Sequence, residues 1–143
     1  MMSWAYIAGL FDGEGCIQFR QRGVGQNGKP WFGIKAQIVQ SNRHAGEKTL
    51  LEVRDFLITN GICCHVRKRT FTTELSRNDI FELEVGGRKA VWMFIKEILP
   101  HAHIRRTDLL DYLRFLVLFP KFRRPGVPLS EHNPHPNLSS PSC

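Results

Sequence analysis

Residues 5–15 constrain the fold of this chain more than any other stretch of its sequence. Helical spacing places the small and polar residues of this stretch on one face, and these are Ala5, Ala8, Gly9, Asp12 and Gly13. The opposite face carries Trp4, Ile7, Leu10 and Phe11. Because a glycine inside a helix costs roughly 1 kcal/mol relative to alanine, the small face favours close approach by a second backbone. We therefore expect a helix with two partners, its own apolar core and another helix.

The end of this helix carries acidic residues. Asp12 and Glu14 flank Gly13, and Gly15 is expected to end the helix. If two copies of the helix pack along their small faces, two Glu14 carboxylates and the adjacent carbonyl groups come together. Such a cluster of hard oxygen ligands suits Mg²⁺ or a similar cation, and crowded carboxylates are unfavourable without one. The pattern thus predicts a metal site between two chains.

A nine-residue motif within this stretch resembles a known family. Residues 7–15 read IAGLFDGEG, which resembles the signature of the LAGLIDADG homing endonucleases, with Glu14 in the place of the second Asp. One motif in 143 residues is similar to the single-motif, homodimeric branch of that family. The motif covers nine positions, but the predicted order of elements matches the family as far as about residue 118.

The charge of the chain indicates a polyanionic partner. The sequence has 20 Lys and Arg against 13 Asp and Glu, a net charge of +7, and a pI near 9.6. It contains no apolar run long enough to span a membrane and no pattern of a secretory signal, so we expect neither membrane insertion nor secretion. The four cysteines include no Cys-x-x-Cys pair, which favours a reducing intracellular compartment, the cytoplasm or an organelle.

The alternation of apolar and polar residues predicts two β-hairpins, with helices between and after them. The expected elements after the motif helix are strands 16–22 and 31–40, a helix 47–59, strands 62–69 and 81–85, a helix 88–99, and a last helix that begins near Thr107. This α-β-β-α-β-β-α-α order predicts an α+β domain over residues 1–119, with a four-stranded antiparallel sheet covered by helices on one face. Residues 120–143 are rich in proline and predict an extended or disordered tail.

The other face of the sheet is predicted to be basic and to bind DNA as a saddle. Its outward-facing candidates are Gln18, Arg20, Arg22, Lys35, Gln37, His65, Arg67 and Arg69. Gln and Arg can make bidentate hydrogen bonds to base edges, and Lys neutralises phosphate. Glu82 and Glu84 share this face and interrupt its positive charge. Two interpretations stay open for them: they accept from cytosine amines, or they lie away from the DNA.

The resemblance to the LAGLIDADG family implies roles for individual residues. The Glu14 carboxylate and the Gly13 carbonyl match the family's metal ligands. Gln40 resembles the polar residue that positions the attacking water, and its alternative role is to cap the following connector. Arg105 matches in order the basic residue near the scissile phosphate, although Arg106 competes for that role and either side chain is equally well explained as a surface cation or phosphate anchor.

The same resemblance places the homodimer interface along the motif helix. The predicted interface residues are Ala5, Ala8, Gly9, Asp12 and Gly13. For Asp12 we favour a role in satisfying backbone donors near this interface over a role as a metal ligand.

As a whole, the resemblance implies a site-specific homing endonuclease encoded within an intron or intein. The expected reaction is a double-strand cut with staggered ends in a long, roughly palindromic double-stranded DNA target. The expected cofactor is Mg²⁺ or Mn²⁺, with Ca²⁺ occupying the site without supporting cleavage. Two alternatives keep the same fold: a maturase that binds intron RNA, and a DNA-binding module that has lost cleavage.

Overall fold

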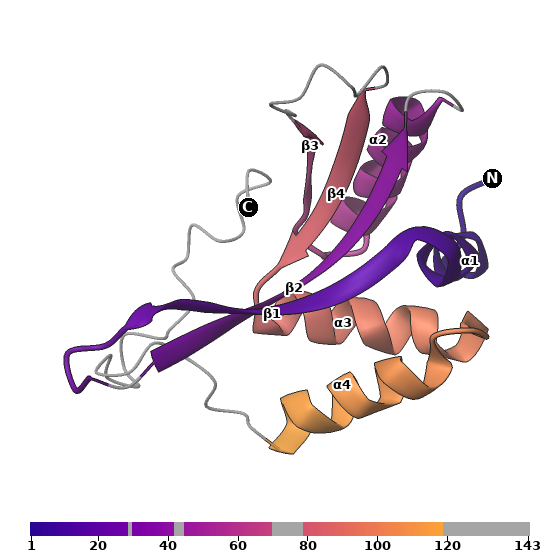
Figure 1. Ribbon diagram of the computed structural model, residues 1–143. Helices are drawn as coiled ribbons and strands as arrows, with labels where there is room; N and C mark the ends of the chain where they lie inside the picture. The colour runs from indigo at the N-terminus through magenta and orange to yellow at the C-terminus, as the bar shows by residue number, and fades with distance from the viewer. Residues whose placement is uncertain (29, 42–44, 70–78, 119–143) are drawn as a thin grey trace.

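A computed structural model describes residues 1–28, 30–41, 45–69 and 79–118 of the chain. Four strands form one antiparallel sheet in the order β1-β2-β4-β3 (Figure 1). They are β1 (Gly15–Val24), β2 (Pro30–Ser41), β3 (His65–Arg69) and β4 (Ile80–Gly86). The two predicted hairpins are therefore β1–β2 and β3–β4, and they join where β2 pairs with β4. The predicted tail, 120–143, and most of the predicted turn between β3 and β4 lie outside the described residues.

The helices are α1 (Trp4–Glu14), α2 (Gly46–Thr59), α3 (Arg88–Ile98) and α4 (Arg106–Leu118), with the short 3₁₀ helix η2 (Leu99–His101) before α4. This confirms the predicted α+β class and the order of its elements. The third strand is shorter than expected, because it begins at His65 and not at Ile62. Within the described residues, no helix is both long enough and apolar enough to cross a membrane.

The core lies between the sheet and the helices, which gather on one side of it (Figure 1). Alternate residues of β2 and β4 face this core, and Ile34, Ile38 and Leu83 among them are fully buried. Fully burying a side chain of this size contributes about 1.5–3 kcal/mol, so the inward faces of the two central strands hold the layers together. Phe19 of β1 stacks on Tyr112 at 5.5 Å between ring centroids, which attaches α4 to the sheet.

The junction between α1 and β1 is set by local contacts. The Ser3 hydroxyl accepts a hydrogen bond from the Tyr6 amide at 3.1 Å and caps the start of α1. At the other end, the Gly15 amide donates to the Phe11 carbonyl. A Cβ atom at Gly15 would overlap the buried Phe11 ring, so the close passage of that ring requires glycine here. The chain therefore turns from helix to strand directly after Glu14.

Candidate functional site

Glu14 is the last residue of α1, and its side chain is exposed. Gly13 beside it is exposed as well. A Cβ atom at Gly9 or Gly13 would have no neighbour within 4 Å among the described residues of this single chain. The carboxylate and the preceding backbone therefore stand at an open end of the helix, where another molecule can approach them.

Some of the predicted interface residues lie on the surface of the chain and others lie in its core. Ala5, Gly9 and Gly13 are exposed, whereas Ala8 is fully buried within its own chain and Asp12 is only 8% exposed. Tyr6, which the sequence analysis did not single out, is 47% exposed on the same helix. The surface that α1 offers to a partner is thus narrower than predicted, because Ala8 and Asp12 face the interior of the subunit.

Asp12 ties the end of α1 to the segment before α4. Its Oδ2 accepts a hydrogen bond from the His103 amide at 2.8 Å, and its Oδ1 accepts one from the Arg105 amide at 3.0 Å. Burial raises the pKa of Asp12, but the hydrogen bonds from backbone amides outweigh burial and hold that pKa below its ordinary value. Asp12 satisfies backbone donors, as we favoured from the sequence, and these donors lie in the segment that carries Arg105.

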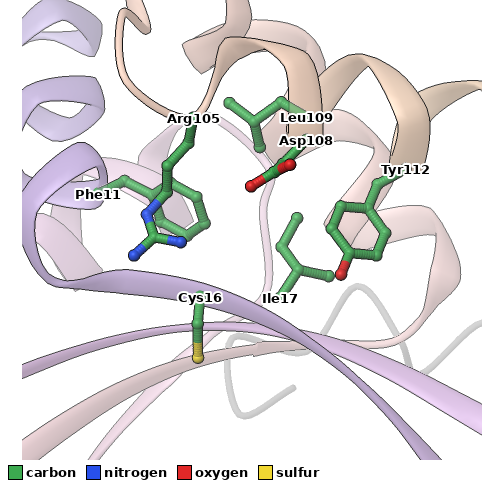
Figure 2. A pocket seen from close by; sticks show the side chains of 7 residues that line it. All are labelled: Phe11, Cys16, Ile17, Arg105, Asp108, Leu109 and Tyr112. Carbon is green, nitrogen blue, oxygen red and sulfur yellow. The ribbon is translucent and has the colours of Figure 1, made fainter.

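Arg105 is held close to the start of β1. Its backbone is fixed by Asp12, and its half-buried side chain lines a cavity of about 80 Å³. Figure 2 shows this side chain extending from the segment before α4 toward Cys16, the second residue of β1. Within the described part of the chain, the buried Nε of Arg105 has no hydrogen-bond partner. The guanidinium therefore lies beside the strand that starts directly after Glu14 and retains an unused donor.

Arg106, the competing candidate, is placed differently. Its side chain is exposed, and its Nη1 donates to the Leu99 carbonyl in η2 at 3.3 Å. Arg105 and not Arg106 lines the cavity next to the start of β1. The geometry favours Arg105 as the cation of the candidate site.

Gln40 lies on β2 with the inward parity predicted for it. Gly15 pairs with Ile38 in the β1–β2 register, so Gln40 lies two residues, about 7 Å, beyond the point where α1 joins the sheet. The side chain is half-buried, and its Cβ approaches the position that a Cβ on Gly46 would occupy, at 2.8 Å. Gln40 is therefore near both the end of α1 and the start of α2, which leaves its catalytic and capping roles open.

The opposite face of the sheet carries the predicted DNA-binding residues in cross-strand rows. Gln18 pairs with Lys35 across β1 and β2, Gln37 with Glu84 across β2 and β4, and Arg67 with Glu82 across β4 and β3. Arg20 and Arg22 belong to β1, but their side chains lie outside the described part of the structure. His65 and Arg67 are exposed, and Arg69 is half-exposed.

Lys35 and Gln37 have the predicted parity but are buried, at 3% and 4% exposed. The expectation of two solvent-facing polar side chains is therefore corrected. The Lys35 ammonium donates to a Glu84 oxygen at 2.9 Å and lies 3.6 Å from a Glu82 oxygen. This cation is enclosed by carboxylates of the neighbouring strand, so it is already neutralised within the chain.

Glu82 is the centre of a charged network on this face. Its carboxylate is fully buried and contacts Lys35, the Arg67 Nη2 at 3.4 Å and the Arg69 Nε. Burial raises the pKa of Glu82, but the hydrogen bond from Arg69 and the charges of Arg69, Arg67 and Lys35 bring it below its ordinary value. The sequence alone left Glu82 unassigned. The opposite charges of Arg67 and Glu82, which pair across the β3–β4 hairpin, are the sequence signal from which this contact could have been predicted.

A single chain does not assemble a complete metal site from the residues described. No group of three or more His, Cys, Asp or Glu side chains lies close enough together to hold an ion among them. The exposed Glu14 carboxylate and the Gly13 carbonyl are hard oxygen donors of the kind Mg²⁺ prefers. Their open position at the end of α1 fits a site completed by a second chain.

The fold of this chain is shared with solved structures. Neither a family model nor a curated protein sequence matches the chain. Solved structures of LAGLIDADG homing endonucleases do match it, and the chain has their fold.

Two of these structures are of the homing endonuclease I-CvuI. In complex with its target in 2 mM Ca it matches with 22% identity and a TM-score of 0.62. In complex with the I-CreI target in 2 mM Mg, with the DNA not cleaved, it matches with 23% identity and a TM-score of 0.64. Each match covers 82% of this chain and 67% of I-CvuI. I-GzeII with its DNA target matches with 13% identity and a TM-score of 0.62, over 99% of this chain and 41% of I-GzeII.

Proposed function

We propose that this chain is a homodimeric, divalent-metal-dependent DNA endonuclease that cuts both strands of a long, roughly palindromic site and leaves staggered ends. The observation that carries this proposal is the exposed Glu14 carboxylate at the end of α1, next to the open surface of Ala5, Gly9 and Gly13. Packing two copies of α1 along this surface would bring the two carboxylates together. The solved neighbours are complexes with DNA targets, which supports DNA as the substrate.

In this proposal, Glu14 and the Gly13 carbonyl of each subunit would hold Mg²⁺ or Mn²⁺. When bound, a divalent ion activates water as a nucleophile and stabilises the charge that develops on the phosphate oxygens. The Arg105 guanidinium is permanently charged, so it is suited to stabilising the phosphate anion and not to moving a proton. Gln40 contributes an amide that can orient the attacking water.

The sheet would lie along the DNA with its polar face toward the bases. A strand of nine or ten residues spans roughly 30 Å, which is close to one turn of the duplex, or about 10 base pairs per subunit. Arg67 and Arg69 remain accessible on this face, and His65 lies beside them. Two subunits related by a dyad would therefore read a site of about 20 base pairs.

The decisive experiment compares Glu14→Gln with wild type on plasmids that carry randomised inserts. In Mg²⁺, wild type should linearise a subset of plasmids that shares one sequence. Glu14→Gln keeps the size of the side chain but removes its charge, so cleavage should fall by about 10² or more while DNA binding is kept. Glu14→Asp should still cut, and Glu97→Gln, an exposed charge change on α3, serves as the control.

Each other outcome has a definite meaning. Cleavage by Glu14→Gln at the wild-type rate would place the active site elsewhere. If wild type binds one DNA sequence without cutting it, the chain is a binding module. If it binds structured intron RNA in preference to DNA, it is a maturase.

A further inference from the structure

Glu82 is the centre of a charged network, and the proposed function gives it no role. The inference concerns Glu82 and rests on the proposed function as a DNA endonuclease. Glu82 lies on β4, between β2, which carries Lys35, and β3, which carries Arg67 and Arg69. Its carboxylate is at the base of the network, with its side chain 1% exposed. Such a buried carboxylate cannot itself reach a base in the groove.

The two arginines above it remain accessible. The side chains of Arg67 and Arg69 are 54% and 37% exposed, although both contact the buried carboxylate. The Lys35 side chain, by contrast, is 4% exposed and contacts both Glu82 and Glu84. The network thus has an inner cation, Lys35, that balances charge, and two outer cations that remain partly exposed. Arg67 contacts both Glu82 and Glu84 through its Nη2.

The atoms used in these contacts leave a recognisable set of donors free for DNA. Among the described residues, Glu82 engages Arg69 through its Nε, which leaves both terminal amino groups of that guanidinium available to another partner. A pair of such donors matches the O6 and N7 acceptors of guanine in the major groove. An arginine carries about 2 kcal/mol of side-chain conformational entropy, and a fixed guanidinium has lost part of it before DNA binds.

We propose that Glu82 is a positioning residue for sequence recognition: it fixes Arg67 and Arg69 so that they read guanine edges in the major groove. Lys35 compensates the charge of Glu82 and contributes nothing directly to base contacts. Removing the Glu82 charge therefore weakens discrimination between sequences while strengthening the attraction to DNA of any sequence, because one repulsive charge is lost.

The test selects binding sites from double-stranded DNA with about 20 randomised base pairs, the span expected for two subunits. Full-length wild type should enrich a site with guanines at defined positions in both halves. Glu82→Gln should lower the preference for guanine at these positions by about tenfold, since one bidentate contact discriminates between bases by about that factor. Arg67→Ala and Arg69→Ala should lower it at the same positions. The binding of Glu82→Gln to unselected DNA should be equal or tighter.

Two further variants separate positioning from charge. Glu82→Asp keeps the charge but withdraws the carboxylate by one methylene, so it should also reduce guanine preference, with unchanged salt dependence. Glu97→Gln makes the same charge change as Glu82→Gln on the exposed side of α3 and should keep the wild-type site. Circular dichroism would show that each variant is folded, and Glu82→Asp remains informative if Glu82→Gln is not.

The results distinguish this inference from the proposed function. If wild type enriches a site but folded Glu82→Gln and Glu82→Asp keep its full base preference, Glu82 does not position the arginines and the inference is wrong. If wild type enriches no site at all, the proposed function is contradicted, and so is the inference that rests on it.

Discussion

Single residues of the motif have separate tasks in this structure, although they are neighbours in sequence. Asp12 is buried and bonded to the amides before α4, whereas Glu14, two residues later, is exposed. Two residues correspond to about 200° of rotation around the helix, which directs one acid into the subunit and the other out of it. The consequence is that mutations of the two acids should affect different properties of the protein.

Asp12→Asn should destabilise the fold. An amide keeps one acceptor oxygen but places an NH₂ group against a backbone N–H, and hydrogen bonds to a charged group are worth about 1.5–3 kcal/mol. Because folding depresses the pKa of Asp12, its contribution is complete above the ordinary Asp pKa, about 3.9, and is lost as the pH falls through the depressed value. Urea denaturation of both proteins at several pH values measures this difference.

The control for Asp12→Asn is Asp111→Asn on α4, where the side chain is 67% exposed and forms an ion pair with exposed Arg114. That change should be nearly neutral, because exposed ion pairs contribute little. A destabilisation of Asp12→Asn that stayed constant into strong acid would contradict the role given to its charge.

Arg105 and Arg106 offer a matched pair for the candidate chemistry. Arg105→Met should lower cleavage by about 10²–10³ with little change in DNA affinity, as expected for loss of a donor to the transition state. Arg106→Met removes a neighbouring cation that donates to Leu99 and should leave the cleavage rate close to wild type. Single-turnover cleavage of the enriched site measures both. Equal losses in the two variants would indicate a general effect of charge.

At the scale of elements, the junction of α1 and β1 depends on Gly15. Gly15→Ala should destabilise the chain by about 1–3 kcal/mol, because the added methyl group overlaps the Phe11 ring in a packed core. Gly13→Ala meets no described neighbour within 4 Å in the single chain, and alanine favours the helix by about 1 kcal/mol. Gly13→Ala should therefore stabilise the subunit while weakening the proposed dimer. Thermal unfolding and sedimentation measure the two effects, and equal stability losses for both variants would contradict this account.

The elements were predictable from sequence where the information is local. The motif helix, the alternation of Ile34, Ala36 and Ile38, and the two glycines at the end of β4 each act within a few residues, so the order of elements follows from them. Boundaries were less predictable: Ile62 and Cys64 have the alternation of a strand, yet β3 begins only at His65. Alternation reports which side chains face the core and not whether the backbone has a pairing partner.

The contacts of the site were less predictable, because they join distant parts of the chain. Lys35 meets Glu82 and Glu84 only because β2 pairs with β4, and parity alone does not reveal that strand order. The donors to Asp12 are likewise found only once η2 and the segment before α4 lie against α1. The faces of the elements were thus predictable, whereas the partners across those faces required the tertiary structure.

At the scale of the whole molecule, the charge of +7 should dominate encounters with DNA. If the dimer makes about six phosphate contacts, its affinity should fall by about 10³ between roughly 50 and 200 mM salt, because counterions released on binding oppose it. Fluorescence anisotropy with a labelled duplex measures this slope. An affinity that did not respond to salt would contradict an electrostatic contribution to binding.

The hydrogen bonds of Asp12 also determine when the candidate site can form during synthesis. The Asp12 and Arg105 partners are 93 residues apart, and at about 5–20 residues per second that separation corresponds to roughly 5–20 s of translation. Until then, the motif helix has left the ribosome without the segment whose amides donate to Asp12. A nascent chain therefore carries the motif proposed to bind metal well before it carries the guanidinium of Arg105, so a prematurely terminated product lacks a complete candidate site.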